Sequence, residues 1–102
     1  GWTIGAVEVE DALLSHPAVA ECGVVGSPDA VRGLVVKAFI ILKTEETDGL
    51  VEDIQDHVRA RLARHEYPRR IEFVSDLPKT PAGKVNRKIL RDREAEKTHA
   101  AE

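Results

Sequence analysis

The chemically most suggestive residue of the chain is a lysine in a short loop that is rich in proline and glycine. Lys84 directly follows Gly83, and Pro78 and Pro81 restrict the shapes that the loop can take. Because glycine lets the backbone approach a ligand closely, the loop could bring the Lys84 ammonium group to a phosphate or carboxylate that gains negative charge. At ~4 Å and an effective dielectric constant of ~20, such a charge pair contributes about 4 kcal/mol. If the pair forms only in a transition state, the gain is roughly a thousandfold in rate.

Two other interpretations of this loop have to be weighed. For an arbitrary Gly-Lys pair, a solvent-exposed loop lysine without a ligand is the more common outcome, and the pair alone does not decide between these roles. A phosphate-binding P-loop is excluded, because that motif has glycine five residues before the Gly-Lys pair and Ser or Thr after it. Here those positions are Pro78 and Val85.

The other candidate nucleophiles and metal ligands form no recognisable constellation. One cysteine cannot build a zinc site, and Cys22 lies in a β-rich segment, where we expect it to pack as a small apolar side chain. The histidines lack metal-ligand spacing, so we expect structural or solvent-exposed roles and no metal site. The four are His16, His57, His65 and His99.

Length and composition indicate one ordinary globular domain. The 102 residues carry a net charge of −3, which gives no general attraction to nucleic acid or to an anionic membrane. No apolar run approaches the ~20 residues that span a bilayer, and no signal peptide is recognisable. The single cysteine fits a reducing compartment, so we expect the cytoplasm, or the mitochondrial matrix in a eukaryote. The first residue is not methionine, and we expect a piece of a longer protein.

The first half of the chain predicts a helix followed by two strands. Acidic residues precede apolar ones in residues 7–16, as suits the start of a helix, and the following proline should end it. Residues 19–25 are rich in β-formers, and residues 27–29 are typical of a turn. The run 34–42 is apolar on both faces, which favours a central strand paired with its predecessor as a hairpin.

The second half predicts a helix, a strand, the lysine loop and a last helix. Apolar residues recur at every fourth position in residues 50–64, which indicates an amphipathic helix. A short strand is expected at 70–74 and a basic helix at 86–93, with a frayed tail after Glu96. The sequence therefore predicts an α+β fold with a small, mostly antiparallel sheet of about three strands, flanked by helices in a two-layer sandwich.

Three segments are similar to motifs of one enzyme superfamily, in the same order. Residues 1–10 (GWTIGAVEVE) resemble the segment that opens the C-terminal domain of adenylate-forming enzymes, and residues 16–21 (HPAVAE) resemble the stretch after it. Residues 77–87 (LPKTPAGKVNR) resemble its closing motif. This superfamily includes acyl-CoA synthetases, peptide-synthetase adenylation domains and firefly-type luciferases. Within it, residues 28–33 and 67–74 are most like acetyl-, medium-chain or aromatic acyl-CoA synthetases.

The resemblance implies that residues 1–102 are the mobile C-terminal domain of an AMP-forming acid:CoA ligase, without its large N-terminal domain. That enzyme joins a carboxylic acid to ATP as an acyl-adenylate, with Mg²⁺ assisting, and CoA then displaces AMP. Lys84 matches the catalytic lysine of the first step, which favours the catalytic role over a solvated loop lysine. Gly83 and Thr80 would support its loop. The partners are the N-terminal domain, the acid, ATP and CoA, and the domain alone should be nearly inactive.

The resemblance also implies contacts with CoA. Gly1 and Trp2 would line the tunnel for its pantetheine arm, and Arg32, Arg59 and Tyr67 would approach its nucleotide. Arginine suits phosphate through its forked, charged donors. Each residue also has a plain structural alternative: a hydrophobic plug for the tryptophan, a turn cap or a solvated helix for the arginines, and core packing for the tyrosine.

Two further functions remain open on the sequence. The chain could belong to a peptide-synthetase adenylation domain that loads a carrier protein, which a carrier domain after Glu102 would favour. It could also be a non-catalytic binding module with the same fold, although the intact Gly83-Lys84 pair speaks against that. Thr3 departs from the family pattern, since many acyl-CoA synthetases carry arginine or lysine there.

Overall fold

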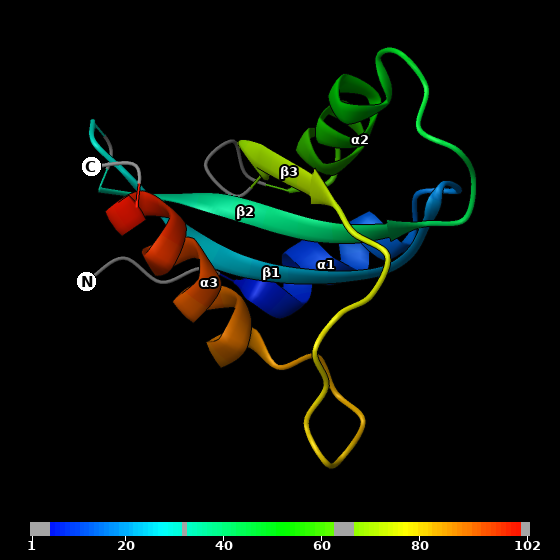
Figure 1. Cartoon of the computed structure of the whole chain (residues 1–102). Helices are drawn as coiled ribbons and strands as arrows, with labels where there is room; N and C mark the ends of the chain where they lie inside the picture. Colours follow the sequence, from blue (N-terminus) through cyan, green and yellow to red (C-terminus); the bar gives the residue numbers. More distant parts are fainter. Residues whose placement is uncertain (1–4, 32, 63–66, 101–102) are drawn as a thin grey trace.

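Three helices and three strands are found in the part of the chain that the computed structural model describes (Figure 1). It describes residues 5–31, 33–62 and 67–100, and for residues 97–100 the backbone only. In chain order the elements are α1 (Ala6–Leu14), β1 (Val19–Asp29), β2 (Gly33–Leu42), α2 (Leu50–Arg59), β3 (Arg70–Phe73) and α3 (Arg87–Ala100). None of these helices is long and apolar enough to cross a membrane.

The sheet has the order β1-β2-β3, so β2 is the central strand, as its apolar sequence predicts. β1 and β2 form an antiparallel hairpin whose register runs from Val19 opposite Leu42 to Asp29 opposite Gly33. β3 lies parallel to β2 over a shorter stretch, because the chain crosses back through α2 before it rejoins the sheet. The predicted small and mostly antiparallel sheet is confirmed, with one parallel edge strand.

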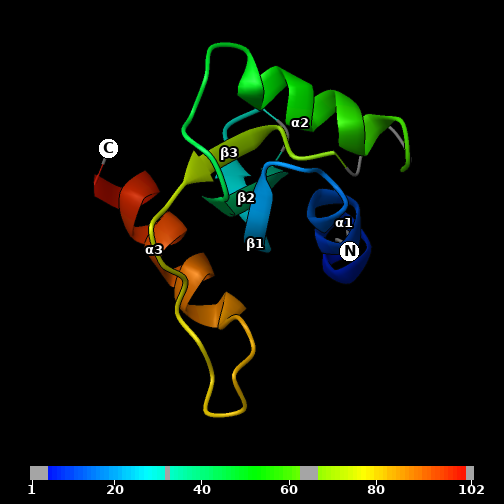
Figure 2. The ribbon, with the colours of Figure 1, turned by 90° about the vertical axis from the view of Figure 1, so that its right-hand side faces the viewer.

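Helices cover both faces of the sheet, and β2 is therefore buried on both of its faces (Figure 2). Its even-numbered residues 36–40 face α1 and α2 in the larger core, and its odd-numbered residues 37–41 face α3. The sequence predicts two layers, and these correspond to the sheet and the helices α1 and α2 packed on it. α3 adds a further layer on the opposite face of the sheet. The smaller core under α3 contains Val25, Phe39, Leu77 and Leu90.

Some element boundaries differ from those that the sequence suggests. β1 continues to Asp29, so the turn expected at 27–29 comes later, where the Asp29 carboxylate accepts a hydrogen bond from the Val31 N–H at 3.1 Å. α2 ends at Arg59, and Arg61 and Leu62 both donate to the Val58 carbonyl in a tightened last turn. The remainder of that predicted helix, residues 63–64, lies outside the described residues.

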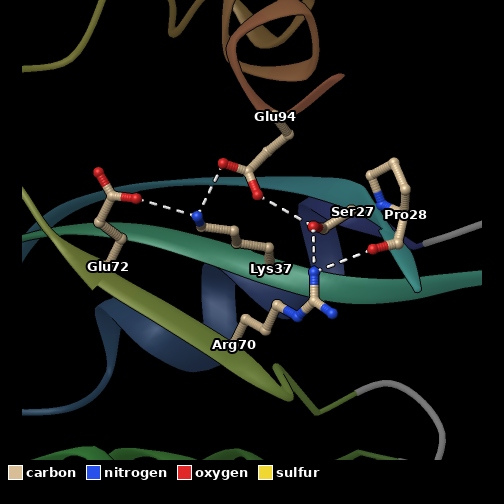
Figure 3. Close-up of polar contacts among 6 residues, drawn as sticks. All are labelled: Ser27, Pro28, Lys37, Arg70, Glu72 and Glu94. Atoms are coloured by element: carbon tan, nitrogen blue, oxygen red, sulfur yellow. Dashed lines mark hydrogen bonds and ion pairs between the residues drawn. The ribbon is translucent and has the colours of Figure 1, made fainter. Parts of the chain in front are cut away.

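α3 is longer than predicted because its middle is tied to the sheet by a buried polar cluster (Figure 3). Lys37 of β2, only 7% exposed, binds Glu94 of α3 at 2.7 Å and Glu72 of β3 at 2.9 Å. The other Glu94 oxygen accepts a hydrogen bond from the Ser27 hydroxyl at 2.9 Å, and that hydroxyl accepts one from Arg70 at 2.9 Å. Side chains from all three strands and α3 therefore meet at one point.

We predict that Glu94→Ala lowers the free energy of unfolding of the chain by about 3–5 kcal/mol, because it leaves the Lys37 ammonium group buried without its main counter-ion. Combining it with Lys37→Met should recover most of that loss, since no buried charge is then left without a counter-ion and the Glu72 carboxylate, 38% exposed, can be solvated. Urea titration of the chain measures both effects. The control is Lys88→Ala, which removes an exposed pair with Asp92 on the same helix and should cost less than about 1 kcal/mol. Equal costs for Glu94→Ala and this control would contradict the prediction.

Candidate functional site

The loop that carries Lys84 is a small hairpin that projects from the edge of the molecule (Figures 1 and 2). We call residues 77–86 the lysine loop. Its two arms meet in an antiparallel bridge between Lys79 and Val85. Thr80 N–H donates to the Lys84 carbonyl at 2.7 Å, and Gly83 N–H donates to the Thr80 carbonyl at 2.9 Å. The loop is therefore held by its own backbone.

The two residues expected to support the loop both contact its tip. Gly83 has φ of 84°, a left-handed conformation that other residues adopt only at a cost, so glycine is required at this turn. The Thr80 hydroxyl accepts a hydrogen bond from the Lys84 N–H at 3.3 Å. These contacts fix the backbone on both sides of the lysine.

Within the described residues, the Lys84 side chain differs from the other basic side chains around the loop in having no partner. Its side chain is exposed, and it makes no hydrogen bond or ion pair within the described residues. Lys79 on the outgoing arm pairs with Glu21 of β1, and Arg87, the first residue after the loop, pairs with Glu10 of α1. The loop therefore leaves its lysine ammonium group available to a ligand while its neighbours are neutralised.

The base of the loop borders an open pocket of about 320 Å³ between α1, β1 and the loop. Gly23 of β1 makes the close approach possible here: a Cβ atom on it would lie 2.8 Å from a Val85 methyl and 2.9 Å from a Leu90 methyl. The pocket is lined by Glu10, Asp11, Leu14, Glu21, Cys22, Lys79, Gly83, Lys84, Val85 and Arg87. It thus collects carboxylates and basic groups within reach of the lysine.

Cys22 borders this pocket but is not a nucleophile at neutral pH. Burial, and then the negative charges of Glu10 and Asp11, together raise the pKa of its thiol to about 12. The thiolate is the reactive form, and it is nearly absent under these conditions. Cys22 packs in the main core, as its β-rich sequence predicts.

A second cluster joins two of the residues expected at the CoA nucleotide. The Arg59 guanidinium lies 4.1 Å from the centre of the Tyr67 ring, and contact with Tyr67 is the main reason why the pKa of Arg59 is raised. Arg69, which the sequence did not single out, lies 5.2 Å from the same ring centre. Gln55 donates to the Pro68 carbonyl at 3.0 Å and ties this segment to α2. Two arginines therefore flank one aromatic ring.

The remaining expected site residues, Gly1, Trp2 and Arg32, lie outside the described residues, and their roles stay predictions.

Two histidines link α1 to α2. His16 is buried and bonds Asp53 at 2.7 Å, and its ring meets that of His57 edge-on at 5.0 Å. Desolvation, then the charges of Arg61 and His16, lower the pKa of His57. These contacts fit the structural roles expected for them.

The family assignment follows from comparison with known proteins. Residues 8–84 match the family described as the AMP-binding enzyme C-terminal domain. The chain belongs to this family. The resemblance to adenylate-forming enzymes that the motifs suggest is thereby confirmed, and this stretch holds all the described candidate residues, from Arg59 to Lys84.

Curated relatives of this AMP-binding C-terminal domain are named as acyl-CoA synthetases. The human mitochondrial acyl-coenzyme A synthetase ACSM1 is 54% identical over 98 residues, which are 92% of this chain and 17% of that protein. The uncharacterised acyl-CoA ligase YtcI of Bacillus subtilis strain 168 is 53% identical over 96 residues, 92% of this chain and 18% of that protein. The chain thus spans less than a fifth of the length of these relatives.

Solved structures give the same assignment. The Brucella canis acyl-CoA synthetase superposes with a TM-score of 0.89 at 52% identity, over 96% of this chain and 18% of that one. The anthranilate CoA ligase AuaEII, solved with anthranoyl-AMP, gives a TM-score of 0.83 at 45% identity, over 89% of this chain and 18% of that one. The preference for acyl-CoA synthetases within the superfamily is therefore also confirmed.

Proposed function

We propose that this domain is the mobile C-terminal part of an AMP-forming acid:CoA ligase and that Lys84 is its catalytic lysine in adenylate formation. The observation that carries the proposal is an exposed ammonium group at the tip of a hairpin that has no counter-ion among the described residues, whereas the neighbouring Lys79 and Arg87 are neutralised. One structural relative was solved with an acyl-adenylate, anthranoyl-AMP, which is the product expected of this step.

In the first step, the acid attacks the α-phosphate of ATP and pyrophosphate leaves. As the new bond forms, the attacking carboxylate oxygen gives up negative charge, and charge builds on the non-bridging α-phosphate oxygens and on the departing pyrophosphate. The Lys84 ammonium group would lie against the carboxylate and α-phosphate oxygens. A preformed loop costs little reorganisation when this happens, so most of the charge interaction can lower the barrier. Mg²⁺ assists the step, and the described residues contain no cluster of three or more acidic, histidine or cysteine ligands that could hold it. We therefore assign the ion to the N-terminal domain.

In the second step, CoA displaces AMP, and the domain presents a different surface after rotation. We propose that Arg59 and Tyr67 meet the CoA nucleotide, because a guanidinium against an aromatic ring offers both a phosphate donor and a stacking surface. Gly1 and Trp2 would line the pantetheine tunnel, and Arg32 would lie near the nucleotide. The domain alone lacks the acyl pocket, so we expect it to be nearly inactive.

The partners of this domain would be its own N-terminal domain, a carboxylic acid, ATP and CoA. A peptide-synthetase adenylation domain and a non-catalytic module are the alternatives, and the acyl-CoA synthetase names of the relatives favour the ligase. We place the enzyme in the cytoplasm, or in the mitochondrial matrix of a eukaryote, since the human relative is named as mitochondrial.

We predict that Lys84→Ala in the full-length protein lowers acid-dependent ATP–pyrophosphate exchange by roughly a thousandfold, because a charge present in the transition state is removed. Thioester formation from chemically supplied acyl-adenylate should change by less than about threefold, a difference that corresponds to under 1 kcal/mol.

The matched control is Lys88→Ala, which removes an exposed lysine of α3 that pairs with the nearby Asp92. It should leave both half-reactions unchanged. Undiminished exchange in Lys84→Ala would return this lysine to a solvated loop residue, and only the family assignment would stand.

We further predict that Arg59→Ala raises the KM for CoA about 10- to 100-fold, because it removes a charged donor and the cation beside the Tyr67 ring. Steady-state thioester formation measures this, and the exchange reaction should be unaffected. Arg61→Ala is the control, since among the described residues this nearby arginine bonds the His57 carbonyl, at 3.0 Å, and not the Tyr67 ring. An equal rise in KM for both variants would indicate a general charge effect and contradict a specific site.

A further inference from the structure

Among the described residues, the Glu10 side chain of α1 ties β1 to the first residue of α3, which directly follows the lysine loop. Its carboxylate is 13% exposed and accepts a hydrogen bond from the Val24 N–H of β1 at 2.9 Å. It also receives two donors from Arg87, the Nε at 3.1 Å and a terminal guanidinium nitrogen. Such a forked contact fixes the planes of both groups as well as their separation.

We propose that Glu10 and Arg87 are positioning residues for Lys84: their ion pair fixes the returning arm of the lysine loop to α1 and β1, so that the ammonium group is held in the orientation needed for adenylate formation. This inference rests on the proposed catalytic role of Lys84. Neither residue is assigned contact with the substrates.

The returning arm is short enough to transmit this constraint. Arg87 is the first residue of α3, and only two residues separate it from Lys84. Val85 is bridged to the opposite arm and packs over Gly23. Asn86 donates to the Pro78 carbonyl at 2.8 Å, and its side chain accepts the Ile89 N–H at 3.3 Å, as an N-cap does. A shift of the guanidinium would therefore move the lysine.

The outgoing arm has a weaker attachment. Lys79 and Glu21 also form an ion pair, but their side chains are 37% and 49% exposed. Exposed pairs between flexible side chains contribute little, because solvent screens them and the side chains lose entropy. The two basic side chains are similarly exposed, Arg87 at 36%, but the Glu10 carboxylate is only 13% exposed and also accepts the Val24 N–H. We therefore assign the position of the loop mainly to the Glu10–Arg87 pair.

The experiment uses the full-length protein with Glu10→Gln, Arg87→Gln and Arg87→Lys. The glutamine at position 10 keeps an oxygen for the Val24 N–H and loses only the charge that holds the guanidinium. We expect both glutamine variants to lower the kcat of ATP–pyrophosphate exchange about 10- to 100-fold, because displacement of a catalytic group by ~1 Å has an effect of this size. KM for ATP and acid should change less than about threefold. Arg87→Lys, which keeps the charge, should lie between the glutamine variants and wild type.

Two parallel variants separate positioning from general destabilisation. Ile54→Val weakens the core under α2, away from the lysine loop, and should lower the melting temperature without a selective loss of exchange. Thioester formation from supplied acyl-adenylate should stay within about threefold of wild type in the Glu10 and Arg87 variants. Lys84→Ala, measured beside them, tests the role on which the inference rests.

The outcomes are distinct. Loss of exchange in Lys84→Ala with normal kcat in Glu10→Gln and Arg87→Gln would overturn the positioning role and leave the catalytic lysine intact. Equal losses of exchange and thioester formation in those glutamine variants, like a loss that follows the melting temperature as in Ile54→Val, would also overturn it. Undiminished exchange in Lys84→Ala would refute the proposed function and, with it, the positioning role.

Discussion

The buried ammonium group of Lys37 sets the arrangement of one whole face of this domain. A charge in a central strand is costly to bury, and it is tolerated only where counter-ions and hydrogen bonds surround it. Glu94 provides that compensation from α3, with Glu72 and Ser27 completing the cluster. Because Glu94 must reach Lys37 on β2, the position of α3 on the sheet is fixed. The C-terminal end of the lysine loop, which leads into α3, is fixed with it.

The same logic of compensated charge extends to the lysine loop. Carboxylates from β1 and α1 neutralise Lys79 and Arg87. Lys84 has no counter-ion among the described residues, so its ammonium group is available to a ligand from outside the domain. A loop whose base is held by ion pairs can present a charged side chain to a ligand while its backbone stays rigid. Arg59 and Tyr67 lie before β3, whereas the lysine loop follows that strand, so the two proposed sites are on different segments of the chain.

Local signals in the sequence predicted most of the helices and strands. The apolar residues at every fourth position of α2 and the apolar run of β2 are local patterns in the sequence. Both elements are therefore predicted at nearly their observed positions. The parallel pairing of β3 and the extension of α3 depend on contacts between distant residues. The Lys37–Glu94 pair spans 57 positions and could not be read from spacing. Loop composition and the family motif identify Lys84 as a candidate in the sequence. Glu10 and Arg69 become candidates only when the structure shows which residues lie next to them.

We infer that a preformed hairpin delivers Lys84, and amide hydrogen exchange of the chain, followed by NMR, can check this. The amides of Thr80, Gly83 and Asn86 donate to backbone carbonyls within the loop at 2.7, 2.9 and 2.8 Å. They should exchange at least about tenfold more slowly than Ala82 at the tip, relative to unstructured rates, because hydrogen-bonded amides exchange only after local opening. If all four exchange at unstructured rates, the loop is open in solution and the account of a preformed site is wrong.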